Sequence, residues 1–251
     1  MSEVLVLCYH SVSESWPAPT SVRPGDIEGQ LRDFLRRGYR GATFAEALTT
    51  PTAERTLVVT FDDAHRSVGE LAAPLLERLG IPATVFVPTD YPDSGRPMGW
   101  DGYDIWLGTE HEQELGCMGW EELGALAERG WEIGSHTRSH PRLSRLGEAE
   151  IAAELAESRK VCEKHLQMPC LSLAYPYGDY DDRVVLAARD AGYRFAATIP
   201  RQPMPAFPLQ WPRVGVYHGE EAGRIRRRAW TRQLAPHASA RVALALRRLK
   251  P

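Results

Sequence analysis

Two adjacent carboxylates stand at the end of an apolar run in the sequence, where a buried strand would stop. Residues 57–67 read LVVTFDDAHRS, so Asp62 and Asp63 follow residues suited to a strand. Successive side chains of a strand point to opposite faces, so the two acids share one site only if the strand ends beside them. Taken alone, the pair is equally well interpreted as a helix N-cap, because Asp is favoured there and SVGELAAPLLERLG is plausibly helical.

Two histidines occur four residues apart in the segment SHTRSH, which follows the apolar run WEIG. A helical turn would bring His136 and His140 to the same side. Two imidazoles and one carboxylate are the usual ligands of a catalytic metal site that keeps one position open for water. If one aspartate binds the metal, the other can act as a base toward the bound water, and the cation keeps that base anionic. The combination therefore predicts a metal site with a neighbouring base.

An alternation of strands and helices must position these residues. Apolar, β-rich runs are EVLVLCYH, TLVVTFDD, ATVFVP, GWEIGSH, LSLAYPYG, YRFAATI and PRVGVYH, with helix-period stretches at 26–37, 68–79, 120–129, 148–165 and 181–191. Gly38, Gly80, Gly130 and Gly192 each follow a helix pattern, where a left-handed C-cap is favoured. This order predicts an α/β fold with a parallel sheet and right-handed crossovers, and the number of units favours a barrel of six or seven strands.

The carboxyl ends of the strands share one face of a parallel α/β barrel, where active sites are built. The candidate residues at the ends of strand runs are therefore expected to converge: His10, Asp62, Asp63, His136, His140 and Tyr177. Residues 88–119 form a long connection rich in Gly, Asp and aromatic residues, which is typical of a functional loop or a small excursion.

Composition indicates an ordinary globular chain of 251 residues, 43% hydrophobic and 25% charged. No apolar stretch approaches the roughly 20 residues of a membrane span. The apolar start VLVLCYH lacks the basic segment and cleavage site of a signal peptide, so the sequence as it stands is expected to stay in the cytoplasm. The four cysteines show no CxxC pairing and are interpreted as reduced thiols.

The net charge of −3 is unevenly distributed. The nine basic and no acidic residues after Glu221 leave a charge of −12 on the rest of the chain. We therefore expect a catalytic domain over 1–220 and a basic helical tail over 221–251. The segment SARVALALRRLK could lie on an anionic membrane as an amphipathic helix, and docking of the tail on the acidic body is the alternative. No nucleic-acid partner is expected, and the sequence makes no prediction about oligomeric state.

Three ordered motifs, TFDD, SHTRSH and YPYG, resemble those of the polysaccharide deacetylases of carbohydrate esterase family 4, which share the NodB homology domain. The resemblance covers about residues 3–217. The start VLVLCYH and the segment MGWEELGALAERGWEIGSH resemble the branch that contains the poly-N-acetylglucosamine deacetylases. The resemblance implies a distorted, incomplete (β/α)-barrel.

The resemblance also implies roles for individual residues. Asp62 matches the catalytic base of the family, while Asp63, His136 and His140 match its metal ligands. Tyr177 matches the residue whose backbone N–H contributes to the oxyanion hole. The early Tyr-His pair makes His10 the preferred general acid.

Two departures from the family pattern concern the surroundings of the base. Ala174 stands where many members have an arginine that orients the base, and Arg213 in WPRVGV is either its replacement from another strand or an ordinary surface residue. The late Leu-x-Ile-His motif, which supplies a protonating histidine, is matched only weakly by His218 in VGVYH.

The implied reaction is hydrolysis of an N-acetyl group on an amino sugar. One divalent metal ion, expected to be Zn²⁺ with Co²⁺, Ni²⁺ or Mn²⁺ as alternatives, would polarise the carbonyl while Asp62 takes a proton from bound water. His10 or His218 would protonate the leaving amine. The absence of an export signal favours a lipid-linked or nucleotide-linked saccharide or a glycosylated metabolite over a secreted glycan.

Two other classes share parts of this pattern. A non-haem iron oxygenase also uses two histidines and one carboxylate, but it would leave Asp62 without a role. A catalytically inactive carbohydrate-binding protein on the same fold is the second alternative, and Ala174 is the feature that favours it. Trp100, Trp106, Trp120 and Trp211 are candidates for stacking on sugar rings or for packing. The remaining histidines, His65, His111, His165 and His237, are interpreted as surface or helix residues.

Overall fold

The computed structural model describes residues 3–50 and 53–231. Its strands are β1 (Glu3–Tyr9), β2 (Ser11–Val12), β3 (Ser21–Val22), β4 (Tyr39–Ala42), β5 (Arg55–Phe61), β6 (Ala83–Val87), β7 (Glu132–Ser135), β8 (Ser172–Ala174), β9 (Phe195–Thr198), β10 (Trp211–Pro212) and β11 (Val214–Gly215). Its α-helices are α1 (Pro24–Arg36), α2 (Phe44–Thr49), α3 (Ala73–Leu79), α4 (Trp120–Glu128), α5 (Glu148–Leu166), α6 (Asp182–Asp190) and α7 (Ala222–Ala229). Strands and helices alternate along the chain, as predicted.

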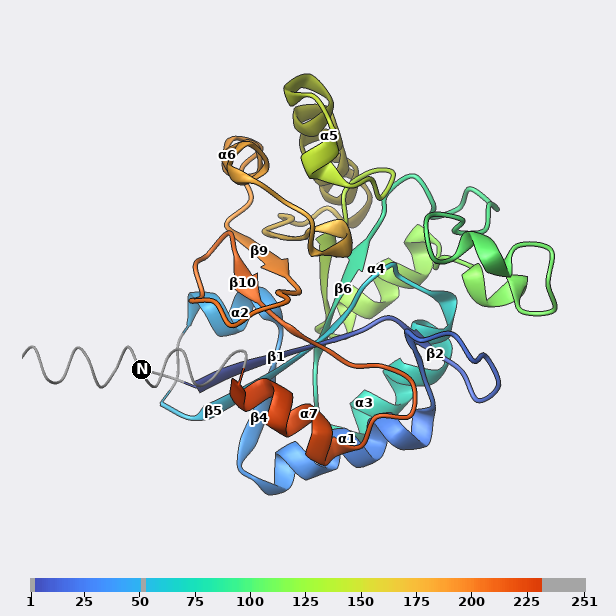
Figure 1. The fold of residues 1–251 in the computed structure, drawn as a ribbon, viewed down its shortest axis with the longest axis vertical. Coiled ribbons are helices and arrows are strands. Elements are labelled where there is room, and N and C mark those ends of the chain that lie inside the picture. The colour runs from blue at the N-terminus through green and yellow to red at the C-terminus, as the bar shows by residue number, and fades with distance from the viewer. Residues whose placement is uncertain (1–2, 51–52, 232–251) are drawn as a thin grey trace, which may run out of the picture.

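The main sheet is parallel and curls into a nearly closed barrel (Figure 1). Its order is β10-β9-β8-β7-β6-β5-β1-β11, and β4 pairs with the first half of β5. The segment from Trp211 to Gly215 joins the two ends of this order, because β10 pairs with β9 while β11 pairs with β1. A distorted α/β barrel is therefore confirmed. Its sheet contains nine strands where six or seven were expected, since the short β4 and β10 were not recognised.

Every second residue of a strand points into the barrel, so the inward-facing side chains of neighbouring strands lie in layers. Inside the barrel, Val6 of β1 and Val58 of β5 lie at one level and pack in an apolar cluster that also contains Phe86 of β6. Phe44 of α2 joins this cluster from the amino end of the strands. One step further along the same faces the residues become polar: Cys8, Thr60 and then Asp62. We call the apolar cluster the floor of the barrel. The polar residues Cys8, Thr60 and Asp62, which lie beyond it at the carboxyl ends of the strands, form what we call the polar cup.

Helices outside the barrel pack against the other faces of the strands to form the larger hydrophobic core. The four glycines expected at helix ends all have positive φ, at 82° for Gly38, 67° for Gly80, 86° for Gly130 and 91° for Gly192. The predicted helix over 68–79 begins as a π-helical turn, Val68–Ala72, before α3. Residues 88–119 form an excursion with two short 3₁₀ turns, Asp104–Trp106 and Glu112–Leu115, at one side of the barrel (Figure 1, green).

The carboxyl-terminal helix α7 lies beside α1 (Figure 1). Ile225 and Ala229 are buried in the core, and Arg226 pairs with Asp33 of α1 at 2.5 Å. The first part of the predicted basic tail is therefore packed on the body. The remainder, including SARVALALRRLK, lies outside the described residues. Within 3–50 and 53–231, no helix has the length and apolar character needed to cross a membrane.

Candidate metal centre and active site

Asp62 continues the inward-facing row of β5 and lies in the polar cup, with 2% of its surface exposed. Arg213 holds it with two hydrogen bonds, Nη1 to Oδ1 at 2.6 Å and Nη2 to Oδ2 at 2.7 Å. Burial is the largest single effect and alone would raise the pKa of this carboxyl. The charge of Arg213, the nearby His136 and the hydrogen bonds from Arg213 together outweigh burial and hold the pKa well below its usual range. Asp62 is therefore a carboxylate at neutral pH.

Asp63 turns out of the strand and faces a different set of partners. Its φ of 69° is left-handed and that of Ala64 is 54°, so β5 ends abruptly at the acid pair. Val68 begins the next helical turn, and the preceding Ser67 makes no side-chain cap, so neither aspartate caps it. The N-cap interpretation is therefore wrong. Burial, followed by the charge of Asp62, raises the pKa of the Asp63 carboxyl well above its usual range.

His136 and His140 converge on Asp63 Oδ1, each with Nε2 at 3.4 Å. The segment between them is not helical, because Thr137 and His140 have φ of 66° and 64°. A left-handed turn thus brings the rings together where a helical turn was expected. His136 Nδ1 donates to the carbonyl of Ala174 at 2.8 Å, which leaves the Nε2 lone pair facing Asp63.

The three side chains fit a divalent cation. Asp63 Oδ1 is buried and has no hydrogen-bond donor among the described residues. One donor atom from each of Asp63, His136 and His140 lies within 4.8 Å of the others. Burial lowers the pKa of both histidines, so both are neutral, which is the form that binds a metal. A bound cation would compensate the negative charge of Asp63 and so lower the pKa of this carboxyl, which burial and the charge of Asp62 otherwise raise.

Backbone strain concentrates at this site. The described chain has seven non-glycine residues with positive φ, and five of them lie in the three segments of the motifs: Asp63, Ala64, Thr137, His140 and Tyr177. Such conformations cost of order 1 kcal/mol or more each and persist only where surrounding contacts impose them. The fold therefore holds these segments in conformations that serve the site and not local stability.

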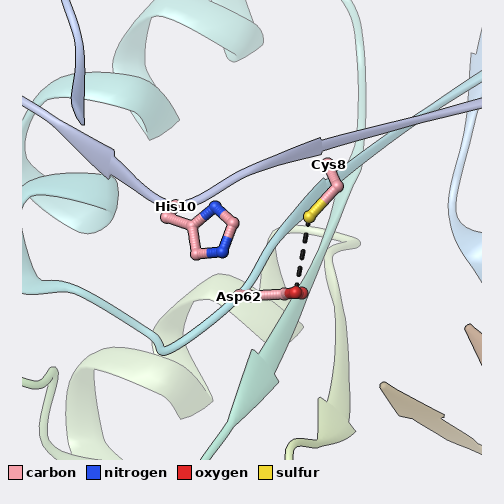
Figure 2. Close-up of side chains that lie close together, drawn as sticks. All are labelled: Cys8, His10 and Asp62. Carbon is pink, nitrogen blue, oxygen red and sulfur yellow. Dashed lines mark hydrogen bonds between the residues drawn. The ribbon is translucent and has the colours of Figure 1, made fainter. Parts of the chain in front are cut away.

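Cys8 and His10 lie close to Asp62 (Figure 2). The Cys8 thiol donates to Asp62 Oδ2 at 3.4 Å, and burial raises the pKa of the thiol well above its usual range. Burial lowers the pKa of His10 to about 4, so its imidazole is neutral at neutral pH. These three residues also lie close enough to hold a metal, but Arg213 already occupies both Asp62 oxygens, and a cation would meet its buried charge. The Asp63 cluster is the better metal site.

Arg213 comes from the segment that closes the barrel, between β10 and β11. Its side chain is fully buried, and Nη1 also donates to Thr60 Oγ1 at 3.0 Å. Ala174 is buried in the apolar floor and its carbonyl holds His136. The arginine expected before Pro-Tyr is thus replaced by one from the segment between β10 and β11, and the surface interpretation of Arg213 is wrong.

Tyr177 lies in the turn after β8, with φ of 59° and ψ of 6°. Its backbone N–H has no hydrogen-bond acceptor among the described residues. Its ring packs edge-on against His140 with centroids 4.7 Å apart, and the Arg142 guanidinium lies 3.9 Å from its centroid. A free amide beside the metal ligands is suitable for binding an oxyanion.

His218 does not join the cluster. It is exposed on the loop after β11, and its Nδ1 lies 3.1 Å from the carbonyl of Ser21. Of the four tryptophans, Trp100 stacks on His140 with centroids 3.9 Å apart. The others pack elsewhere: Trp106 on Trp16, Trp120 on His165, and Trp211 against the barrel floor.

His65 is the clearest error of the sequence interpretation. The sequence favours a surface or helix position for His65, but its side chain is fully buried. Its Nδ1 lies 2.9 Å from the carbonyl of Glu114, its Nε2 lies 2.9 Å from the Tyr103 hydroxyl, and that hydroxyl donates to Asp63 Oδ2 at 3.0 Å. His111 is half-buried beside Trp106 and His165 is exposed on α5, while His237 lies outside the described residues. No disulfide links the four cysteines, all of which the structure describes.

Fold and site together define an α/β barrel with a two-histidine, one-aspartate cluster that could hold a metal ion and an adjacent buried carboxylate–arginine pair. A profile of the polysaccharide deacetylase family matches residues 49–196, more than half of the chain. The chain belongs to the polysaccharide deacetylase family.

Among curated proteins, the chain is similar to the putative polysaccharide deacetylase YxkH of Bacillus subtilis, with 26% identity over 198 residues, 77% of this chain and 63% of that protein. It is also 26% identical to the poly-β-1,6-N-acetyl-D-glucosamine N-deacetylase of Staphylococcus aureus over 192 residues, 71% of this chain and 61% of that protein. The matches therefore span less than two thirds of the length of these relatives.

Solved structures share the fold. The deacetylase PplD of Streptococcus pyogenes, in complex with acetate, superposes with a TM-score of 0.74 at 20% identity and covers 90% of this chain and 97% of that one. IcaB from Ammonifex degensii gives a TM-score of 0.68 at 25% identity and covers 85% of this chain and 91% of that one.

Proposed function

We propose that this protein is a metal-dependent N-deacetylase of amino sugars. The observation that carries the proposal is the pairing of two acids with different surroundings: Asp63 faces two neutral histidines, while Asp62 is held ionised by Arg213. One acid is thus arranged as a ligand and the other as a base. The name of the Staphylococcus aureus relative supports an N-acetylated sugar as the substrate.

Asp63, His136 and His140 would hold one divalent cation, and zinc is the ion that this donor set suits best. When bound, such a cation polarises an acyl oxygen and makes water more acidic. The remaining steps belong to the chain. Asp62 would accept the proton of the attacking water, and its proximity to the cluster, with Oδ2 3.9 Å from His136 Nε2, supports this role.

His10 would deliver a proton to the leaving amine. Because it is neutral at neutral pH, the proton must first reach it, and Asp62 is the neighbour that can supply the one taken from water. Tyr177 would stabilise the negative charge on the carbonyl oxygen through its free backbone N–H. The products would be acetate and a free amino sugar.

Neither alternative accounts for the site as well. In an oxygenase the ionised Asp62 beside the cluster would have no role. In an inactive binding protein we would expect the base or a ligand to be lost, and the absent family arginine, which favoured this alternative, is replaced by Arg213.

The substrate class is tested by acetate release from a panel of N-acetylated sugars. The panel contains β-1,6-linked N-acetylglucosamine oligomers, a nucleotide-linked and a lipid-linked N-acetyl amino sugar, and an N-acetylglucosamine-bearing metabolite. Activity on any arm supports the function and identifies the class, whereas metal-loaded protein inactive on all arms favours the binding protein.

We also propose that the protein works in the cytoplasm and contacts the inner membrane face through its carboxyl-terminal part. Arg227 on α7 is exposed, and Trp230, directly after this helix, is 60% exposed. Basic and aromatic side chains of this kind favour an anionic membrane surface.

Vesicle flotation tests the membrane contact. Deleting residues 232–251 removes none of the residues that the structure describes, including helix α7, and circular dichroism checks that the truncated form is folded. We expect the full chain to float with phosphatidylglycerol vesicles, and neither form to float with phosphatidylcholine. The truncated form should lose most of the binding, because it lacks five of the nine basic residues of the tail. Equal flotation of both forms would contradict a role for these residues.

A further inference from the structure

One turn of the excursion contacts the metal centre at three points. Trp100 stacks on the ring of His140, with centroids 3.9 Å apart and planes 22° apart. Asp101 binds Arg142 at 2.9 Å, and Arg142 in turn lies over the ring of Tyr177. Tyr103 donates its hydroxyl proton to Asp63 Oδ2 at 3.0 Å. Residues 100–103 thus reach two of the three candidate ligands and the turn of the free amide.

His65 fixes the position of the Tyr103 hydroxyl. A carbonyl oxygen only accepts, so His65 Nδ1 carries the proton in its 2.9 Å contact with the Glu114 carbonyl. The Nε2 atom is then an acceptor 2.9 Å from the Tyr103 oxygen, so the single hydroxyl proton of Tyr103 lies between two acceptors, His65 Nε2 and Asp63 Oδ2. Trp16 packs against both rings, with centroids 5.9 Å away in each case. Glu114 and Tyr103 both belong to the excursion. His65, which follows the end of β5, therefore contacts the excursion at two separate positions.

The contact with Tyr103 determines which oxygen of Asp63 is available to a metal ion. With Oδ2 held by Tyr103, the other oxygen, Oδ1, is the one that faces both imidazoles and lacks a donor among the described residues. Hydrogen bonds to the outer atoms of metal ligands orient them and commonly change metal affinity by about 10–100-fold when removed.

We propose that Tyr103 and His65 are positioning residues that fix Asp63 for metal binding and couple the metal centre to the 88–119 excursion. The inference rests on the metal assignment of the proposed function but not on the reaction. Because coupling is reciprocal, a loop that strengthens metal binding is itself stabilised by the metal. Metal-loaded protein should therefore have a more rigid excursion than metal-free protein.

The first test is zinc affinity, measured by competition with a chromophoric chelator. Tyr103→Phe should weaken zinc binding by about 10–100-fold. Tyr39→Phe is the matched control, since Tyr39 is similarly buried and donates to the carboxylate of Glu3, at the amino end of β1 and away from the candidate ligands at the carboxyl ends of the strands. That variant should bind zinc as the wild type does. His65→Asn should weaken binding, and His65→Gln, whose amide can reach the Nε2 position, should restore part of it.

The second readout is hydrogen exchange of the excursion. Amides such as those of Met98, bonded to Leu115, and Tyr103, bonded to Trp100, should exchange more slowly with zinc in the wild type and in Tyr39→Phe. In Tyr103→Phe zinc should no longer slow them. Equal zinc affinity in Tyr103→Phe and wild type, or equal protection of the loop, overturns this inference alone. A wild type that binds no zinc overturns both this inference and the metal assignment, and neither readout depends on deacetylation.

Discussion

Replacing Asp62 by Asn is expected to lower turnover by about 10²–10⁴-fold while zinc remains bound. The amide has the shape of the carboxylate but cannot accept the proton of the attacking water. The three candidate ligands, Asp63, His136 and His140, are untouched. Acetate release and zinc content are measured on the same preparation. Zinc lost together with turnover would mean that Asp62 is a ligand, and unchanged turnover would reject its role as base.

A control for Asp62→Asn must account for the buried positive charge of Arg213, which this variant leaves unpaired. Asp62→Asn leaves the fully buried Arg213 without its counter-ion, so part of the loss could come from instability. The double variant Asp62→Asn, Arg213→Met removes both charges, and replacing a whole buried pair is often nearly neutral for stability. We expect the double variant to be more stable than Asp62→Asn and equally inactive. Recovery of turnover with stability would contradict the proton-transfer role.

Replacing Arg213 alone by Met is expected to destabilise the fold by about 3–5 kcal/mol at pH 7, because it leaves a buried carboxylate unpaired. In the wild type the folded pKa of Asp62 lies below its unfolded value of about 3.9, so the stability from this pair is fully present above that value and is lost as pH falls through the folded pKa. In the variant, burial without Arg213 raises that pKa. The difference in free energy of unfolding between the wild type and Arg213→Met should therefore be smaller at pH 5 than at pH 7. Urea unfolding at the two pH values measures it.

The same variant should shift the acid limb of kcat/KM to higher pH, since the base now ionises less readily. Arg159→Met is the matched control, because Arg159 binds the carbonyls of Cys170 and Ala191 away from the site. It should lose stability without moving the acid limb. An unshifted acid limb in Arg213→Met would show that Arg213 does not set the ionisation of the base.

The sequence predicted the strand ends well, because buried strands and the residues that follow them are local patterns. His10, Asp62, Asp63, His136 and Tyr177 were placed at the carboxyl end of a parallel sheet, and the structure brings them there. The short strand β4 was missed because YRGA lacks an apolar, β-branched run. The acid pair is explained by geometry: Asp62 keeps the inward direction of β5, whereas Asp63 leaves it through a left-handed turn.

The contacts between distant segments were harder to predict. Tyr103 binds Asp63 across 40 residues and His65 binds the Glu114 carbonyl across 49, and no local period reports such pairs. Cys8 could have been found, since the period of two places it on the same face as Asp62 once β1 and β5 are paired. Arg213 was a candidate only through the family pattern. Its burial depends on how 211–215 closes the barrel, which is a property of the whole sheet.

The most direct test of the account is the joint quantification of acetate and free amine after incubating the protein with N-acetylated saccharides, with zinc and after chelation. We predict that zinc-loaded protein releases acetate and amine in equal amounts from at least one substrate, that chelation abolishes the release, and that added zinc restores it. Release of neither product by protein with confirmed bound zinc, or release that is unaffected by complete metal removal, would contradict metal-dependent deacetylation.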